Sequence, residues 1–303
     1  MFGLDQHRQT LVLNIYLYQK LGICSGGRNS NATPAQSPNV VRHFRETSFN
    51  MKQKLLKWTL RITAVTLLTL ALLICIVLTP SLMYANKTMV DNFTVYHNKP
   101  LDKEFKTQIV EAASLLKASE LYDANYKIDI CLNDGSNYPT LIQALHSKAF
   151  GIGFYNKVVI MGNINIKENY TEIVGYKYNL TELIAHESLH CFQFHKLGFW
   201  KSNPIAKYPD WKWEGYNEYV ARTHHANLLN NITYLNQELE KHKDEWGISF
   251  DDSTYVGRDY YRWWTLMQYC IDIKKMTYKQ VLADTTSEQT VRQEMMKWFN
   301  GRE

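Results

Sequence analysis

The longest apolar run in the chain lies between Ile62 and Leu78 and is diluted only by threonines. Extended to Met83, it reaches the roughly 20 residues that a helix needs to cross a bilayer. Basic residues crowd its N-terminal side, at Arg42, Arg45, Lys52, Lys54, Lys57 and Arg61. Because basic flanks stay in the cytosol, the pattern predicts a single-pass membrane helix over residues 58–84, with the N-terminus cytosolic and the rest of the chain outside.

Two other interpretations of this segment stay open. Met51 begins a basic stretch ahead of the apolar run, as in a secretory signal. In this interpretation Met51 is the true start, residues 1–50 are an upstream extension, and cleavage near Ala85 gives a secreted protein. A buried helix of a soluble protein is the second alternative. The anchor is favoured because the run is long for a signal. Ahead of it, a stretch rich in Gly, Ser, Asn and Pro at 25–39 predicts disorder, and we interpret residues 1–57 as a disordered cytosolic segment.

Beyond the anchor, the pattern predicts an α+β domain over residues 101–303, preceded by a polar linker over residues 85–100. Residues 105–121 have the spacing of an amphipathic helix, and apolar runs at 127–132 and 157–161 predict the strands of a small N-terminal sheet. After Glu214 the sequence predicts helices only, at 214–229, 234–243, 258–273 and 288–299.

An apolar, helix-like run at residues 180–194 carries the most informative motif, His186 to His190 with the spacing H-E-x-x-H. Imidazoles at i and i+4 project from one side of a helix, one turn apart, so both can bind one zinc ion. Glu187 lies beside them, where it can take a proton from a metal-bound water. The motif therefore indicates zinc chemistry.

The ends of this helix are also visible in the sequence. Asn179, with Glu182 three residues later, is typical of an N-cap, and Gly198 is typical of a C-terminal end. A largely buried helix that carries two histidines and a glutamate needs a partner for them, and a metal ion is one. Histidines satisfied by hydrogen bonds alone are the alternative.

A catalytic zinc ion takes three protein ligands, so a third should follow the motif. The metzincin arrangement fails, because Gln193 and Lys196 stand where it needs Gly and His. Residues 211–219 (WKWEGYNEY) instead resemble the W-x-x-E-G-x-x-E-Y signature of gluzincin metallopeptidases. This resemblance implies that Glu214 is the third zinc ligand and that Glu218, one turn later, fixes the tautomer of a ligand histidine. An exposed helix carboxylate is the alternative for Glu218.

The resemblance covers residues 181–220 and extends weakly to Tyr269. It implies a mainly helical, zincin-like domain that hydrolyses peptide bonds of a peptide or protein substrate, with Glu187 as general base. The strand at 157–161, ahead of the active-site helix, would bind substrate backbone through an exposed edge. An ordinary interior strand is the alternative. With the anchor, the expected protein is a membrane-anchored zinc metallopeptidase with an extracytoplasmic catalytic domain.

Hydrolysis of an amide by a zinc enzyme also needs a donor that stabilises the oxyanion. The pattern Y-x4-L-M-x-Y that begins at Tyr261 resembles a tyrosine-led helix found late in several gluzincin families. It implies Tyr261 as this donor, and a structural role in the core is the alternative. His224 and His225 are a rival metal pair, but adjacent residues on a helix diverge by about 100°, so we interpret them as structural.

Composition excludes some partners. The net charge of the 303 residues is +5 and part of it flanks the anchor, so nucleic-acid binding is not indicated. Of the 5 Cys, only Cys131, Cys191 and Cys270 follow the anchor, which allows at most one disulfide. The sequence leaves the oligomeric state open.

Two rival functions remain. A noncatalytic, zinc-stabilised ectodomain would act as a binding module, and the presence of Glu187 favours an enzyme over it because only hydrolysis needs this base. A chance motif in a helical binding protein is the second rival. It is decided by whether Glu214 converges in space on the two histidines.

Overall fold

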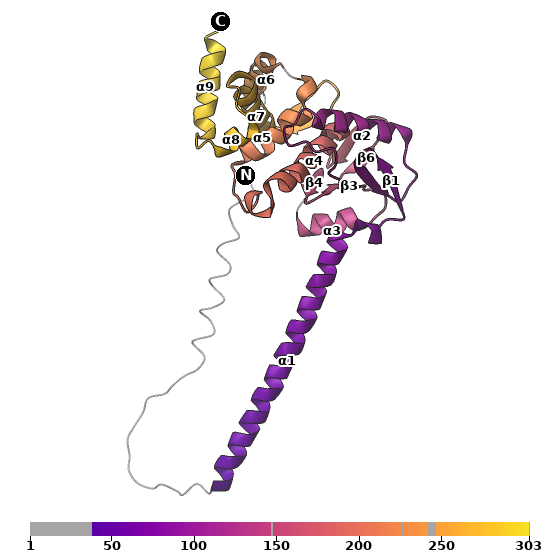
Figure 1. Ribbon diagram of the computed structural model, residues 1–303, viewed down its shortest axis with the longest axis vertical. Helices are drawn as coiled ribbons and strands as arrows, with labels where there is room; N and C mark the ends of the chain where they lie inside the picture. The colour runs from indigo at the N-terminus through magenta and orange to yellow at the C-terminus, as the bar shows by residue number, and fades with distance from the viewer. Residues whose placement is uncertain (1–37, 147, 226, 242–246, 303) are drawn as a thin grey trace, which may run out of the picture. The chain divides into compact units, whose positions relative to one another are not determined.

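The computed structural model describes residues 38–146, 148–225, 227–241 and 247–302 (Figure 1). The chain divides into two compact units between Leu67 and Leu68. The disorder expected for residues 1–37 lies outside the described residues. From Pro38 to Leu78 the chain forms one helix, α1, so residues 38–57 are helical rather than disordered.

Within α1, Gln53–Leu78 is long and apolar enough to cross a membrane, and it alone meets that test among the described residues. The apolar window of this segment is not buried inside the protein. Apolar side chains left uncovered over this length are expected of a segment surrounded by lipid. The described part of the chain therefore contains one segment suited to a single membrane crossing.

Two strands occupy the region for which the sequence indicates a linker. β1 (Asn86–Val90) pairs antiparallel with β2 (Phe93–His97). Phe93 and Val95 are fully buried, so β2 belongs to the core. The predicted domain boundary at residue 101 is therefore wrong, because the polar residues around these strands conceal a short alternating pattern.

A five-stranded mixed sheet in the order β1-β2-β3-β5-β4 frames the body. Its other strands are β3 (Ile128–Cys131), β4 (Gly151–Phe154) and β5 (Lys157–Ile160). β2, β3 and β5 run parallel, whereas β1 and β4 are antiparallel strands at the two edges. Helices cover both faces (Figure 1).

The alternation of side chains along β5 shows how the two faces are filled. Val158 points into the larger core, which α2 (Lys103–Leu116) and α4 (Leu180–Leu197) complete. Val159 points into a smaller cluster on the other face, together with residues of α3 (Tyr138–Leu145). α4, which carries the H-E-x-x-H motif, is thus buried against the sheet.

The edge strand of the sheet beside α4 is β4. The predicted strand at residues 157–161 is β5, which lies between β3 and β4, so of its two interpretations the interior strand is confirmed. Gly153 on β4 has no room for a side chain, because a Cβ atom there would lie 2.0 Å from the backbone oxygen of Glu187. The glycine lets the edge strand approach the helix backbone at the motif itself.

A three-stranded antiparallel sheet leads directly into α4. It consists of β6 (Asn163–Asn165), β7 (Tyr170–Ile173) and β8 (Tyr176–Asn179). Asn179 Oδ1 accepts a hydrogen bond from the backbone N–H of Glu182 at 3.1 Å, which confirms the predicted N-cap. The predicted end of α4 at Gly198, where φ is 80°, is also confirmed.

The rest of the body is mainly helical. Its helices are α5 (Asp210–Ala221), α6 (Leu228–Lys241), α7 (Arg258–Gln268), a π-helical turn (Tyr269–Ile273), α8 (Tyr278–Ala283) and α9 (Glu288–Asn300). A hairpin of β9 (Gly247–Ser249) and β10 (Tyr255–Gly257) interrupts them, so the expectation of helices only is wrong. The mixed α+β class with a small N-terminal sheet is confirmed.

The contact between α5 and α7 explains a glycine of the second motif. A Cβ atom at Gly215 would lie 2.8 Å from the backbone oxygen of Trp263. The glycine that follows Glu214 therefore allows α7 to pack directly on the backbone of α5.

Candidate metal centre

His186, His190 and Glu214 bring one donor atom each to a common region. The Nε2 atoms of both histidines lie 3.2 Å from the same atom, Oε2 of Glu214. Ligands about 2.0–2.1 Å from one tetrahedral zinc ion stand roughly 3.3 Å apart, so these separations fit such an ion. Glu214 thus converges on the histidine pair, and the three residues could hold a metal ion.

The helices that carry these residues pack against each other. His186 and His190 lie on α4 and Glu214 lies on α5. The three side chains are only 6%, 15% and 18% exposed, respectively. Burial of imidazoles and a carboxylate is unfavourable unless each has a partner. Here they are partners of one another, and a shared cation would satisfy all three.

Glu218 faces His186 through the other ring nitrogen. Its Oε1 lies 2.9 Å from His186 Nδ1 and accepts a hydrogen bond from the Tyr178 hydroxyl at 2.7 Å. Arg222 Nε donates to its second oxygen at 2.6 Å. The carboxylate is therefore fixed, and it holds the ring of His186 with Nε2 toward Glu214. The structure places Glu218 in the interior beside the histidine, not at the exposed position that was the alternative.

Gln193 contacts His190 as Glu218 contacts His186, through the Nδ1 atom of the ring. Its Nε2 donates to the backbone oxygen of Trp213 at 3.1 Å and lies 2.8 Å from the Tyr278 hydroxyl, which leaves Oε1 3.0 Å from His190 Nδ1. The Asn217 amide nitrogen lies 3.0 Å from the same ring atom. Because two contacts fix the Gln193 amide, we place the proton on Nδ1, which leaves the Nε2 lone pair free. The Asn217 amide must then be turned over, so that its Oδ1, which is buried without another partner, faces Nδ1. The i+3 spacing from His190 is the sequence signal for this contact.

The electrostatics of the centre favour a cation. Burial alone would lower the pKa of both imidazoles, but nearby carboxylates, chiefly Glu214, outweigh it and raise the pKa of His186 and His190. Burial would raise the pKa of the Glu214 carboxyl, yet the two imidazoles hold it well below its usual range. Such a site attracts either protons or a metal ion in their place.

Glu187 lies next to the convergent group without belonging to it. The residue is 7% exposed. Burial raises the pKa of its carboxyl, which His186 and His190 partly offset. A carboxylate with a raised pKa is a stronger proton acceptor than an ordinary one, so this environment suits a general base.

The structure brings Tyr260, and not Tyr261, to the centre. The Tyr261 hydroxyl donates to Asn231 Oδ1 at 3.3 Å inside a separate apolar cluster. The ring of Tyr260 lies 6.1 Å from that of His186, centroid to centroid. Burial raises the pKa of Tyr260, as do the carboxylates of the centre. Adjacent residues on α7 point about 100° apart, so Tyr261 lies in the core, as its alternative interpretation has it, while Tyr260 faces the centre.

A cavity of about 510 Å³ opens beside the centre. His186, Glu187 and Tyr260 line it on one side. Much of the remaining wall is apolar and includes Phe150 and Val174. The cavity therefore joins the candidate base to a surface that can receive an apolar group.

His224 and His225 do not join this centre. They occupy a 3₁₀ turn rather than an α-helix, and both Nε2 atoms lie near Glu182 Oε1. The predicted divergence of the two rings is wrong because the turn brings them together, with ring centroids 4.0 Å apart.

No family model, curated protein or solved structure matches this chain.

Replacing Arg222 by methionine should lower the free energy of unfolding by roughly 3–5 kcal/mol, because it leaves the buried carboxylates of Glu182 and Glu218 without their cation. Urea denaturation of the full chain in detergent micelles with a chelator measures this. Arg262→Met is the matched control, since Arg262 pairs with the partly exposed Glu288. This substitution should lower the free energy of unfolding by less than about 1 kcal/mol. Equal effects of the two variants would contradict the importance of the buried network.

Proposed function

We propose that this chain is a zinc-dependent peptidase of the gluzincin type. The observation that carries the proposal is the convergence of His186, His190 and Glu214, with Glu187 adjacent but outside the group. Two histidines of an H-E-x-x-H helix and a downstream glutamate are the zinc ligands expected of this class. A chance H-E-x-x-H motif would not explain why Glu214 Oε2 lies 3.2 Å from the Nε2 atoms of both histidines.

A zinc ion held by these residues would supply a Lewis acid for the substrate carbonyl and would lower the pKa of water. Glu187 accepts a proton from the attacking water and passes it to the leaving amine. Glu218 and Gln193 orient His186 and His190 for this work, and both are themselves held by hydrogen bonds in the core.

Tyr260 is the residue that we assign to the developing oxyanion. It lines the same cavity as Glu187 and lies beside His186. Its raised pKa keeps the hydroxyl protonated, so it can donate a hydrogen bond to negative charge.

The free edge of β4 is suited to an extended peptide, which would add to the sheet as a further strand and pass Glu187. An apolar side chain of that peptide would enter the cavity past Phe150 and Val174. The substrate is accordingly a peptide or an unfolded segment of a protein.

We further propose that Gln53–Leu78 anchors the enzyme in a membrane. The basic residues that precede it favour a cytosolic N-terminus, with the catalytic body on the other side of the membrane.

Glu187→Gln should retain zinc and lose hydrolysis by 10²-fold or more, roughly the contribution of a general base, because Glu187 is not a ligand. Elemental analysis of the full-length protein reports zinc, and mass spectrometry of a mixed peptide library reports cleavage. Glu168→Gln, at an exposed carboxylate in the β6–β7 turn, should change neither. Retained hydrolysis would remove Glu187 as the base, and lost zinc would make it a ligand.

Tyr260→Phe should reduce kcat roughly 10²-fold with zinc retained, as expected for removal of an oxyanion donor. Its neighbour supplies the control, since Tyr261→Phe loses only the hydrogen bond to Asn231 and should cost about 1 kcal/mol of stability while keeping kcat. Steady-state kinetics on one cleaved peptide separates the two, and the reverse order of effects would assign the role to Tyr261.

A further inference from the structure

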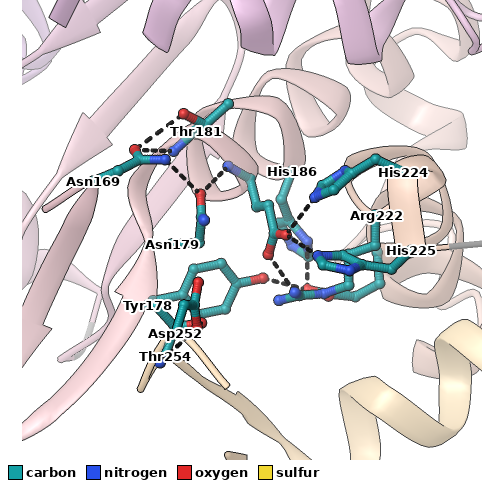
Figure 2. Close-up of polar contacts among 12 residues, drawn as sticks. Asn169, Tyr178, Asn179, Thr181, His186, Arg222, His224, His225, Asp252 and Thr254 are labelled. Carbon is teal, nitrogen blue, oxygen red and sulfur yellow. Dashed lines mark hydrogen bonds and ion pairs between the residues drawn. The ribbon is translucent and has the colours of Figure 1, made fainter. Parts of the chain in front are cut away.

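A second group of ligand atoms lies around Glu182, at the first turn of α4. The Nε2 atoms of His224 and His225 lie 3.3 and 3.2 Å from its Oε1. Figure 2 shows both imidazoles turned toward one point beside Arg222. Two imidazole nitrogens and one carboxylate oxygen thus repeat the composition and the separations found at His186.

The local backbone explains why neighbouring histidines converge. Thr223–His225 form a 3₁₀ turn directly after α5. The ring of His225 stacks on Phe250, with an interplanar angle of 11° and centroids 5.8 Å apart. This stack holds one imidazole in place, and the turn brings the His224 ring beside it.

The net negative charge around Glu182 favours the binding of a cation. Its side chain is 3% exposed, and Arg222 pairs with it and with Glu218 at the same time. One guanidinium between two buried carboxylates leaves a net negative charge on the three residues. Neutral imidazoles do not cancel this charge, but they can bind a metal ion that does.

The second group of ligand atoms is more open to solvent than the centre at His186. The side chains of His224 and His225 are 46% and 45% exposed, so an ion can reach them from solvent. A cavity of about 340 Å³ adjoins the group and is lined by His224, Glu182 and Asn169. Polar side chains in its wall, such as Asn169, can hold water molecules that complete the coordination of an ion with three protein ligands.

We propose that Glu182, His224 and His225 form a second binding site for a divalent transition-metal ion such as zinc. Two nitrogens and one carboxylate oxygen suit zinc and its neighbours rather than calcium or magnesium. The ion joins the first turn of α4 to the turn after α5. It binds more weakly than the ion at His186, because its imidazoles are half exposed.

The test is a zinc titration of the full-length protein in detergent micelles, first stripped with a chelator and then dialysed against buffered zinc. The wild type should bind two ions in separate steps. His224→Ala should weaken the second step at least tenfold and leave the first unchanged, because His225 keeps its stack and its bond to Glu182. Peptide hydrolysis by this variant should match the wild type.

His195→Ala is the control, since that imidazole also faces a carboxylate, Asp123, at 3.4 Å but has no second histidine beside it. Both steps should survive in this variant. A single step in the wild type, or a second step unchanged in His224→Ala, would overturn the proposal. Glu214→Ala separates this test from the proposed peptidase, because it should lose the tight step and keep the weak one. Loss of the weak step there would contradict an independent second site.

Discussion

Arg222 joins the two helices on which the candidate centre depends. It lies on the turn after α5, donates to Glu218 on that helix and pairs with Glu182 on α4 (Figure 2). Glu218 in turn fixes His186. A buried cation between two buried carboxylates is favourable only if all three stay together, so the network sets the position of α5 on α4. The separation between Glu214 and the histidines follows from that position.

Two glycines allow close backbone contacts around the candidate centre. Gly153 lets β4 touch α4 beside Glu187, and Gly215 lets α7 touch α5 beside Glu214. Side chains at these positions would displace the elements that surround the centre. The geometry of the candidate site therefore depends on backbone packing as much as on the chemistry of its own residues.

Local patterns predicted much of this site. The i, i+4 spacing identified His186 and His190, and the cap at Asn179 fixed the start of their helix. Glu214 and Glu218 followed from a resemblance, and the structure brings both to the histidines. Tyr260 and Tyr261 differ only in direction on α7, which depends on how that helix packs, so sequence could not choose between them. The strand β2 was missed because its parallel partner, β3, lies more than 30 residues away, and β1 was missed with it because β1 pairs with β2.

The zinc affinity of Glu214→Ala tests the central claim most directly. The measurement uses the His224→Ala background, in which the weak step lies further from the tight one, and compares full-length proteins in the same micelles. Mutation of a residue that only hydrogen-bonds to a zinc ligand typically lowers zinc affinity by roughly 10–100-fold. Removal of a ligand itself should therefore weaken the tight step by roughly 100-fold or more. An unchanged affinity in a folded protein would show that Glu214 is not a ligand and would contradict the proposed metal centre.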